Sequence, residues 1–296
     1  MDQELSNAVA QAVSAATGAT FEPRAHSGVG GGCINAAWRL DGDGRSYFVK
    51  LNEPGREEMF AAEFAGLEEL RAANAVRVPA PVCHGATARA AFLVLEYLDL
   101  GRGAAAGYEE LGRRLAAQHR VTRPEFGWRR DNTIGSTPQP NRPAADWVRF
   151  WRERRLGHQL ELAAANGHRG RLQQRGERLL AALPAVLAGH APQAALLHGD
   201  LWSGNAAFTR GGEPVIFDPA VYYGDREADI AMTELFGGFP AAFYHAYREA
   251  WPLDAGYGLR KTLYNLYHVL NHLNLFGGGY RAQAEDMIDM LLGEVN

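Results

Sequence analysis

The segment from His198 to Asn205, His-Gly-Asp-Leu-Trp-Ser-Gly-Asn, carries side chains suited to phosphoryl transfer. Asp200 precedes Asn205 by five positions, and Asp218 follows thirteen positions later, directly after the apolar run 215–217. This order of carboxylate, amide and carboxylate is typical of kinase sites. A hydroxyl nucleophile needs a carboxylate to take its proton, and Mg²⁺ on a triphosphate needs hard oxygen ligands. We therefore predict that Asp200 is the base, Asn205 a Mg²⁺ ligand and Asp218 the principal Mg²⁺ ligand.

Each of these residues also has a plainer interpretation. Asp200 and Asn205 could be turn residues, and Asp218 could cap a strand. The joint spacing of the three, with a strand on either side of the Gly211-Gly212 turn, favours the kinase-type site. His198 is expected to pack and form hydrogen bonds as structural support rather than to act in catalysis.

Lysine occurs at only two positions, Lys50 and Lys261, whereas the other 28 basic residues are arginine. Drift in codon usage could by itself have left lysine at only two positions. The alternative is that at least one position needs a compact ammonium group, which a planar guanidinium cannot imitate. Lys50 ends the strand-like run Phe48-Val49-Lys50, as a nucleotide-binding lysine does in kinases, and is predicted to hold the α- and β-phosphates of ATP. Glu63, thirteen residues later in an expected helix, is predicted to orient Lys50; the alternative is a solvated helix face.

A glycine cluster precedes the strand pair that ends at Lys50. The pattern Gly28-x-Gly30-x-x-Cys33 lacks the third glycine of a G-x-G-x-x-G loop and is weak evidence alone. Its position predicts a loop over the phosphates, in which backbone N–H groups of Gly30, Gly31 and Gly32 approach the nucleotide.

Two lobes are expected to position these residues. A helix over 2–17, strands over 36–40 and 46–51 joined by a turn at 41–44, a helix over 55–74 and a strand over 92–98 predict a small sheet-bearing lobe. Helical patterns dominate after residue 107, over 108–120, 144–165, 170–189, 228–236, 240–250, 257–275 and 281–293, interrupted by short strands over 205–209 and 214–217. The predicted lobes are an N-terminal nucleotide-binding lobe, 1–98, and a C-terminal catalytic and substrate lobe, 99–296. Adenine should meet the backbone of Glu96, Tyr97 and Leu98, where the lobes join.

The composition is that of a globular protein. Among 296 residues, 47% are hydrophobic and 22% charged, and the formal net charge of −4 does not indicate attraction to nucleic acid or anionic lipid. No apolar stretch reaches the roughly 18 residues of a spanning helix, and residues 1–4 lack a signal-peptide pattern. Two cysteines fit a reducing compartment. We expect no nucleic-acid or membrane partner and a cytoplasmic location.

The chain resembles the fructosamine kinase (ketosamine-3-kinase) family, which is related to aminoglycoside and choline kinases. The resemblance covers nearly the whole chain and is carried by Gly31-Gly32-Cys33-Ile34-Asn35, Phe48-Val49-Lys50, His198 to Asn205, Asp218-Pro219-Ala220-Val221-Tyr222-Tyr223-Gly224, Phe126-Gly127-Trp128 and the segment 132–141. It implies an α+β, two-lobed protein-kinase-like fold with ATP and Mg²⁺ as cofactors. It also implies transfer of the γ-phosphate to the 3-hydroxyl of ketosamines, either small molecules or glycated protein amines. The 3-phosphate then decomposes and frees the amine, which is deglycation.

The resemblance assigns further roles. Trp202 and the segment 132–141 are candidates for an aromatic substrate wall, with ordinary core packing as the alternative. Asp229 is expected to brace the catalytic loop. A cysteine at the position of Cys33 is a family feature linked to disulfide dimers, so we predict a redox-sensitive homodimer through Cys33, with Cys83 less reactive. The alternative is that Cys33 merely fits the turn.

Two other functions compete with this interpretation. One is a kinase of another hydroxylated amine, such as an aminoglycoside or choline, and the net charge does not decide between them. The other is a pseudokinase that binds nucleotide without catalysis. Such proteins tend to lose the lysine, the base or the metal-binding aspartate, whereas Lys50, Asp200, Asn205 and Asp218 are all present here.

Overall fold

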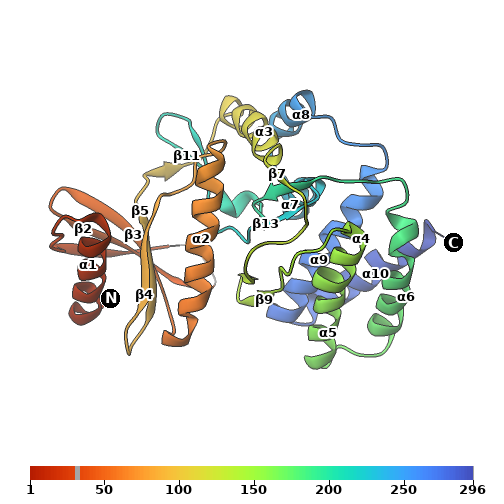
Figure 1. The fold of residues 1–296 in the computed structure, drawn as a ribbon, viewed down its shortest axis with the longest axis horizontal. Coiled ribbons are helices and arrows are strands. Elements are labelled where there is room, and N and C mark those ends of the chain that lie inside the picture. Colours follow the sequence, from red (N-terminus) through yellow and green to blue (C-terminus); the bar gives the residue numbers. More distant parts are fainter. Residues whose placement is uncertain (31–33, 296) are drawn as a thin grey trace.

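A computed structural model of the chain describes residues 1–30 and 34–295. An antiparallel five-stranded sheet with the order β1-β2-β3-β5-β4 forms the first part of the molecule (Figure 1). Its strands are β1 (Ala25–Val29), β2 (Ala36–Gly42), β3 (Arg45–Asn52), β4 (Pro81–Ala86) and β5 (Ala91–Glu96).

Helices α1 (Gln3–Thr17) and α2 (Glu57–Ala73) cover opposite faces of this sheet (Figure 1). Along β5, Phe92 and Val94 belong to the apolar cluster that contains the α1 side chains, whereas Leu93 and Leu95 belong to the cluster that contains the α2 side chains. Successive side chains of a strand point to opposite faces, so burial on both sides explains the unbroken apolar run of β5.

Local turn chemistry fixes the ends of the strands. Asp43 and Gly44 have φ angles of 51° and 72°, as the tight hairpin predicted between β2 and β3 requires. The helix over 55–74 ends as expected before the Pro-rich segment, and Pro81 opens β4. Because β4 lies at the sheet edge, a residue without an N–H donor is tolerated there.

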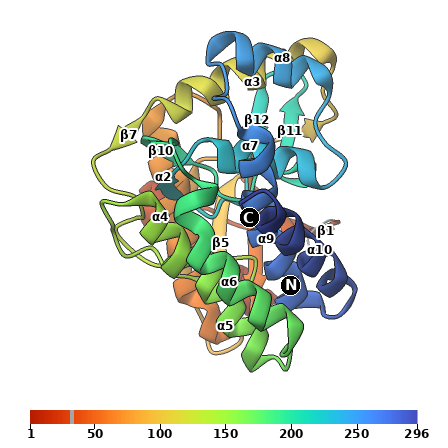
Figure 2. The ribbon, with the colours of Figure 1, turned by 90° about the vertical axis from the view of Figure 1, so that its right-hand side faces the viewer.

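The rest of the chain is mainly helical. The helix α3 packs against α8, and α10 lies between α9 and α6 (Figures 1 and 2). The helices are α3 (Ala105–His119), α4 (Trp147–Phe150), α5 (Gly157–Ala165), α6 (Arg171–Val186), α7 (Glu227–Leu235), α8 (Ala241–Ala250), α9 (Tyr257–Phe276) and α10 (Gly279–Gly293).

The single helix expected over 144–165 is interrupted by a π-helical turn. This turn, η2 (Trp151–Leu156), lies between α4 and α5. At its end, a Cβ on Gly157 would lie 2.5 Å from the carbonyl oxygen of Arg152, so only glycine fits the tight backbone approach. The apolar spacing did not reveal this turn, because a π-turn shifts the helical period by only one residue.

Three short sheets organise the central segment. The strand β10 (Ala194–Leu197) pairs with β13 (Tyr222–Gly224) and β7 (Thr122–Arg123). The strand β11 (Ala206–Thr209) pairs with β12 (Pro214–Ile216) and β6 (Leu100–Gly101), and β8 (Asn132–Ile134) pairs with β9 (Thr137–Gln139). The segment 198–205 therefore joins two sheets, and its last residues form a 3₁₀ turn, η3 (Ser203–Asn205).

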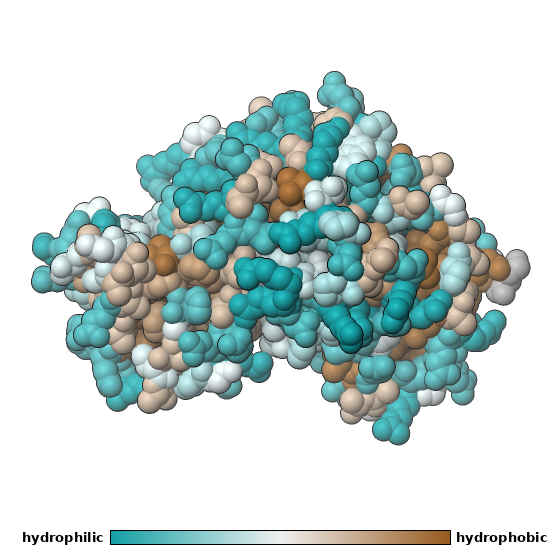
Figure 3. Space-filling view, in the orientation of Figure 1, coloured by the Kyte–Doolittle hydropathy of each residue, from teal (hydrophilic) through white to brown (hydrophobic). Residues whose placement is uncertain are grey.

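Some expectations need correction. Gly28 was expected in a loop but lies in β1, paired with Trp38. The strand β5 ends at Glu96, so Tyr97 and Leu98 lie beyond it. The lobe boundary between residues 98 and 99 stays a prediction. Within the described ranges, no helix combines the length and apolar character needed to cross a bilayer. The visible surface is mostly hydrophilic and is notched between the sheet-bearing and helical parts (Figure 3).

Candidate active site

Lys50 lies between two carboxylates from distant parts of the chain. Its Nζ is 2.5 Å from Oε1 of Glu63 and 2.6 Å from Oδ1 of Asp218. Lys50 is only 4% exposed. Burial disfavours its charged form, but the charges of Asp218 and Glu63 outweigh this effect and raise the pKa of Lys50. The side chain is therefore a fixed cation at this position.

The alternation of side chains along β3 and the helical spacing along α2 together bring Lys50 and Glu63 into contact. Tyr47, Val49 and Leu51 pack in the cluster with α1, so Lys50 must point to the other face of β3, toward α2. On α2, Phe60 and Leu67 are fully buried, and Glu63 lies between them at helical spacing. The predicted pair of Lys50 and Glu63 is thus brought together.

The backbone of the loop after β10 is held by one carboxylate. Oδ2 of Asp229 accepts a hydrogen bond from the N–H of His198 at 2.7 Å, and Oδ1 accepts one from Gly199 at 2.8 Å. Burial alone would raise the pKa of Asp229, but hydrogen bonds from His119 and this backbone keep it below its usual value. The position of Asp229 agrees with the bracing role expected for it.

His198 connects the two loops of the site. Its Nδ1 accepts the N–H of Asp200 at 3.2 Å, so its Nε2 donates to the carbonyl oxygen of Phe217 at 2.9 Å. Burial lowers the pKa of His198. A neutral, internally bonded imidazole suits support of the loops rather than proton transfer.

Asp200 is half-buried and close to other acids. Burial, and then the negative charges of Asp218 and Asp229, raise its pKa to about 7, while the amide of Asn205 opposes the shift. A carboxylate with a pKa near the working pH is well matched to accept a proton from a hydroxyl group.

Asn205 and Asp218 present a donor set that fits Mg²⁺. The Nδ2 of Asn205 donates to the carbonyl oxygen of Asp200 at 2.8 Å, and its Oδ1 accepts no hydrogen bond from the described residues. Asp218 keeps one carboxylate oxygen beside Lys50 and has a side chain that is 44% exposed. An amide oxygen and a carboxylate are the hard ligands that Mg²⁺ prefers. Asp218 also has a φ of 57°, a left-handed conformation that is costly for a residue other than glycine.

The expected nucleotide contacts are only partly described. Gly30 lies directly after β1, and Gly31, Gly32 and Cys33 lie outside the described residues. The N–H of Glu96 already donates to the carbonyl oxygen of Ala80 at 2.8 Å, so that group is not free for adenine.

Beyond β5, the hinge backbone is freer. Leu98 makes no backbone hydrogen bond to another described residue. The ring of Tyr97 is covered by Arg39, whose guanidinium lies 4.4 Å from the ring centre. Tyr97 likewise makes no backbone hydrogen bond to another described residue, so the backbones of both Tyr97 and Leu98 stay candidates for the adenine contact.

Trp202 and the segment 132–141 occupy different environments. Trp202 is 37% exposed, and its ring meets Phe236 edge-on at 6.2 Å. A Cβ on Gly204 would lie 2.3 Å from the Trp202 ring, so glycine lets the ring lie over the loop. By contrast, the side chains of Asn132, Gln139 and Asn141 are buried and point into the protein. Among the candidates for the substrate wall, Trp202 is exposed, and Thr133 and Ser136 of the segment 132–141 are partly exposed.

Sequence reasoning missed His119, at the end of α3. Its Nε2 lies 3.1 Å from Asp229 and its Nδ1 lies 2.8 Å from the hydroxyl of Tyr247. A histidine at the end of an amphipathic helix carries no specific signal, so only the fold reveals this support of the catalytic loop.

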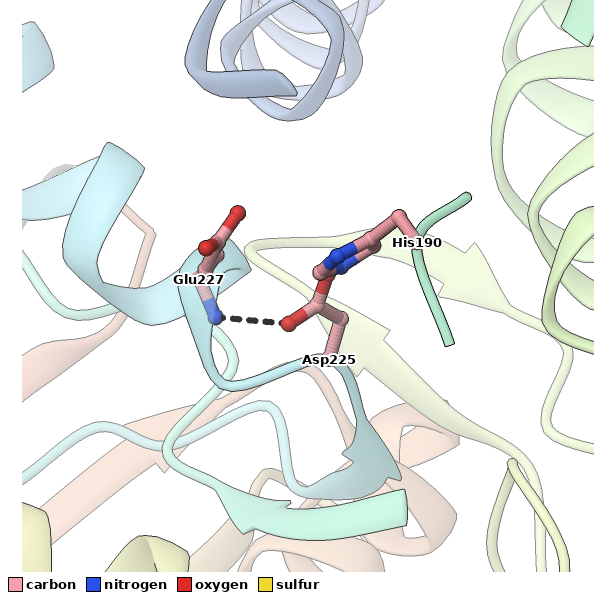
Figure 4. A group of neighbouring side chains, drawn as sticks. All are labelled: His190, Asp225 and Glu227. Carbon is pink, nitrogen blue, oxygen red and sulfur yellow. Dashed lines mark hydrogen bonds and ion pairs between the residues drawn. The ribbon is translucent and has the colours of Figure 1, made fainter. Parts of the chain in front are cut away.

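A second cluster could by residue type bind a metal. His190, Asp225 and Glu227 lie close together (Figure 4). However, Asp225 already contacts His190 and the hydroxyl of Tyr264, and both oxygens of Glu227 bind Arg260, at 2.6 and 2.9 Å. With their oxygens committed, these residues form an internal polar network.

The chain is similar to known proteins over nearly its whole length. The family model described as "Fructosamine kinase" matches residues 5–294. A "Probable ketoamine kinase" of Synechocystis sp. is 49% identical over 285 residues, covering 96% of each chain. A chloroplastic "Protein-ribulosamine 3-kinase" of Arabidopsis thaliana is 44% identical over 264 residues, covering 88% of this chain and 80% of its own.

Solved structures share the fold of this chain over nearly its whole length. A Haemophilus somnus protein assigned as a fructosamine-3-kinase has 29% identity and a TM-score of 0.89, covering 96% of each chain. The choline kinase LicA of Streptococcus pneumoniae, at 13% identity, shares the fold alone, with a TM-score of 0.66 over 99% of this chain and 100% of its own.

The fold and the set of Lys50, Glu63, Asp200, Asn205 and Asp218 define a protein-kinase-like phosphotransferase, which confirms the predicted fold class. The chain belongs to the fructosamine kinase family. The resemblance read from the motifs is thereby confirmed.

Proposed function

We propose that this enzyme transfers the γ-phosphoryl group of ATP to the 3-hydroxyl of ketosamines. The observation that carries the proposal is Lys50 held between Glu63 and Asp218, in a chain 49% identical to a protein named "Probable ketoamine kinase". The product, a 3-phosphorylated adduct, would decompose and release the amine, which is deglycation. The proposed reaction needs ATP, and a chain with only two cysteines fits a reducing compartment. Both points support a cytoplasmic location.

Each residue of the site has a chemical task in this proposal. Lys50 binds the α- and β-phosphates, oriented by Glu63. Asn205 Oδ1 and Asp218 would hold Mg²⁺, which neutralises charge on the phosphates when bound. Asp200 accepts the hydroxyl proton, and its neighbour Trp202 supplies an apolar face for the acceptor, whose amine stays cationic. Asp229 and His198 fix the loop.

A panel of acceptors tests the proposal. We expect ADP release with fructoselysine, ribuloselysine and a glycated protein, each as acceptor with Mg·ATP. Kanamycin, hygromycin and choline should give at least tenfold lower kcat/KM, since a site built to bond the hydroxyls of one acceptor rejects others strongly. Preferred turnover of an aminoglycoside or choline would replace the ketosamine assignment, and turnover of none would favour the pseudokinase.

The rate should depend on pH through Asp200. Only the ionised carboxylate accepts a proton, so kcat/KM for the acceptor should fall as pH drops through the pKa of Asp200 and be restored above it. Without metal this pKa is about 7. Bound Mg²⁺ offsets the charge of Asp218 and should move the acid limb below pH 7. A pH profile at saturating Mg·ATP measures this limb, and a rate flat from pH 5 to 8 would exclude Asp200 as the titrating base.

We further propose that oxidation inactivates the enzyme through Cys33. Peroxide would oxidise two Cys33 thiols of separate chains to one disulfide, with release of water, and link the two phosphate loops. Cys83 is a poor competitor, because burial raises the pKa of its thiol to about 11.

Non-reducing electrophoresis and activity after mild peroxide test this proposal. The wild type and Cys83→Ala should dimerise and lose activity, whereas Cys33→Ala should do neither. An equal response of Cys33→Ala would exclude this mechanism.

A further inference from the structure

A buried network of amide side chains lies directly behind the segment that follows Asp218. Asn132, Gln139 and Asn141, from the hairpin β8–β9 and the residues after it, are 9%, 1% and 0% exposed. Nδ2 of Asn132 donates to the carbonyl oxygen of Val221 at 2.8 Å, and Nε2 of Gln139 donates to that of Ala220 at 3.1 Å. Two consecutive carbonyl groups, two and three residues after Asp218, are thus fixed by side chains.

The far end of the network is a fully buried arginine. Arg155, in the π-helical turn η2, is 0% exposed and forms no ion pair with any described carboxylate. One guanidinium nitrogen donates to Oδ1 of Asn141 at 2.7 Å, and another donates to the carbonyl oxygen of Pro140 at 2.7 Å. The cation is instead flanked by aromatic rings, with that of Tyr222 centred 4.0 Å away.

Arg155 sets the orientation of the whole network because it can only donate hydrogen bonds. It turns Oδ1 of Asn141 toward itself, so Nδ2 of Asn141 must face Oδ1 of Asn132, at 2.7 Å. Asn132 then directs its own Nδ2 at Val221. Oδ1 of Asn132 also accepts Nε2 of Gln139 at 2.8 Å, which directs that amide at Ala220. The hydroxyl of Tyr267 donates to the remaining Oε1 of Gln139 at 2.7 Å and holds the amide in this orientation.

The segment that carries these fixed carbonyl groups follows Asp218 and also contacts the loop of His198 and Gly199. The N–H of Ala220 donates to the carbonyl oxygen of His198 at 2.9 Å. Its carbonyl oxygen lies so close to Gly199 that a Cβ there would be 2.0 Å away. Asp218 itself has the costly φ of 57°. A strained residue keeps such a conformation only where its surroundings determine it, and the amide network supplies that constraint.

We propose that Arg155 and Tyr267 are positioning residues for the metal ligand Asp218, acting through Asn141, Asn132 and Gln139 on the backbone of Ala220 and Val221. The proposal rests on the Mg²⁺-binding role of Asp218 in the proposed function. The buried amides of the β8–β9 segment thereby support the proposed metal site.

Two tyrosines of α9 provide a matched test. Tyr267 and Tyr264 are 2% and 0% exposed, but Tyr264 donates its hydroxyl to Asp225 in the separate cluster of Figure 4. Tyr267→Phe and Tyr264→Phe each remove one buried hydroxyl. The Tyr264 hydroxyl also accepts Nε1 of Trp147 at 3.1 Å, so Tyr264→Phe should lower the melting temperature at least as much as Tyr267→Phe. Arg155→Met removes the donor at the other end of the network, and Arg155→Lys retains a donor-only cation.

The readout is the Mg²⁺ enhancement of ADP binding, the ratio of calorimetric ADP affinities with Mg²⁺ and with EDTA. We expect this ratio to fall about tenfold in Arg155→Met, as for other residues that orient a metal ligand. Tyr267→Phe and Arg155→Lys should show a smaller loss, and Tyr264→Phe none. ADP affinity in EDTA should be unchanged, and amide exchange over 217–224 should accelerate in the Arg155 and Tyr267 variants but not in Tyr264→Phe.

Equal ratios in Tyr267→Phe, Arg155→Lys and the wild type would overturn the positioning role, as would an equal loss in Tyr264→Phe. Tyr267→Phe, Arg155→Lys and Tyr264→Phe test the positioning role even if Arg155→Met does not fold. Asp218→Asn distinguishes failure of the positioning role of Arg155 and Tyr267 from failure of the metal-ligand role of Asp218. If it abolishes the Mg²⁺ enhancement while the network variants keep it, only the positioning role fails. If the enhancement survives in Asp218→Asn, the proposed metal ligand is wrong.

Discussion

Asp200→Asn is expected to lower kcat by on the order of 10²-fold or more while nucleotide affinity stays within about twofold, because a positioned base contributes that much to proton transfer. The amide has the shape of the carboxylate and can remain beside Asn205, whose Nδ2 lies 3.3 Å from Asp200 Oδ2. The phosphate and metal ligands are untouched. Steady-state kinetics with a ketosamine, and calorimetry with Mg·ADP, measure the two quantities separately.

A structural role for Asp200 would give a different pattern. Loss of nucleotide affinity together with kcat, or a lowered melting temperature, would indicate damage to the loop. Activity near that of the wild type would exclude Asp200 as the base. The acid limb of the pH profile provides an independent check, since residual activity in Asp200→Asn should lose the limb assigned to this carboxyl group.

Lys50→Arg is expected to lower kcat/KM by on the order of 10²-fold, although the charge is conserved. The ammonium fits between Glu63 and Asp218, with contacts of 2.5 and 2.6 Å in a site that is almost closed to solvent. A guanidinium is wider and planar, so it should displace the phosphates or lose Glu63. Activity and Mg·ATP affinity of the variant measure this effect.

Lys261→Arg is the matched control, because it makes the same substitution at the other lysine. Lys261 is 38% exposed in its side chain and contacts Glu234 at 2.8 Å. Arginine can make the same contact there, so activity should be unchanged. Equal effects of the two substitutions would show that the retention of lysine at position 50 has no chemical meaning.

Chemistry-bearing residues were predictable from sequence where local spacing encodes their place. Strand alternation places Lys50 on the face of β3 that looks toward α2, and helical spacing places Glu63 opposite. Asp200 and Asn205 are close because only a short loop and a 3₁₀ turn separate them. Both pairs depend on residues that are near each other in the sequence, so the spacing of the motif residues is enough to predict them.

The supporting structure was not predictable in the same way. Asn132 meets Val221 across 89 positions, and Asp229 meets His119 across 110. Such pairs depend on how distant elements pack, and an asparagine or histidine in isolation gives no indication of its partner. The same limit applies to the segment 132–141: its spacing did not indicate that Asn132, Gln139 and Asn141 are buried, and the contact of its more exposed residues with substrate stays a prediction.

The most direct test of a ketosamine 3-kinase is the structure of its product. Fructoselysine labelled with ¹³C should be incubated with Mg·ATP and the enzyme, and the mixture followed by ³¹P and ¹³C NMR. We expect a phosphomonoester whose phosphorus couples to C3 of the sugar, followed by its decay with release of free lysine. With Asp200→Asn both signals should form more slowly, by on the order of 10²-fold or more. A phosphomonoester on another carbon, or ATP consumption without a phosphorylated sugar, would contradict the proposed function.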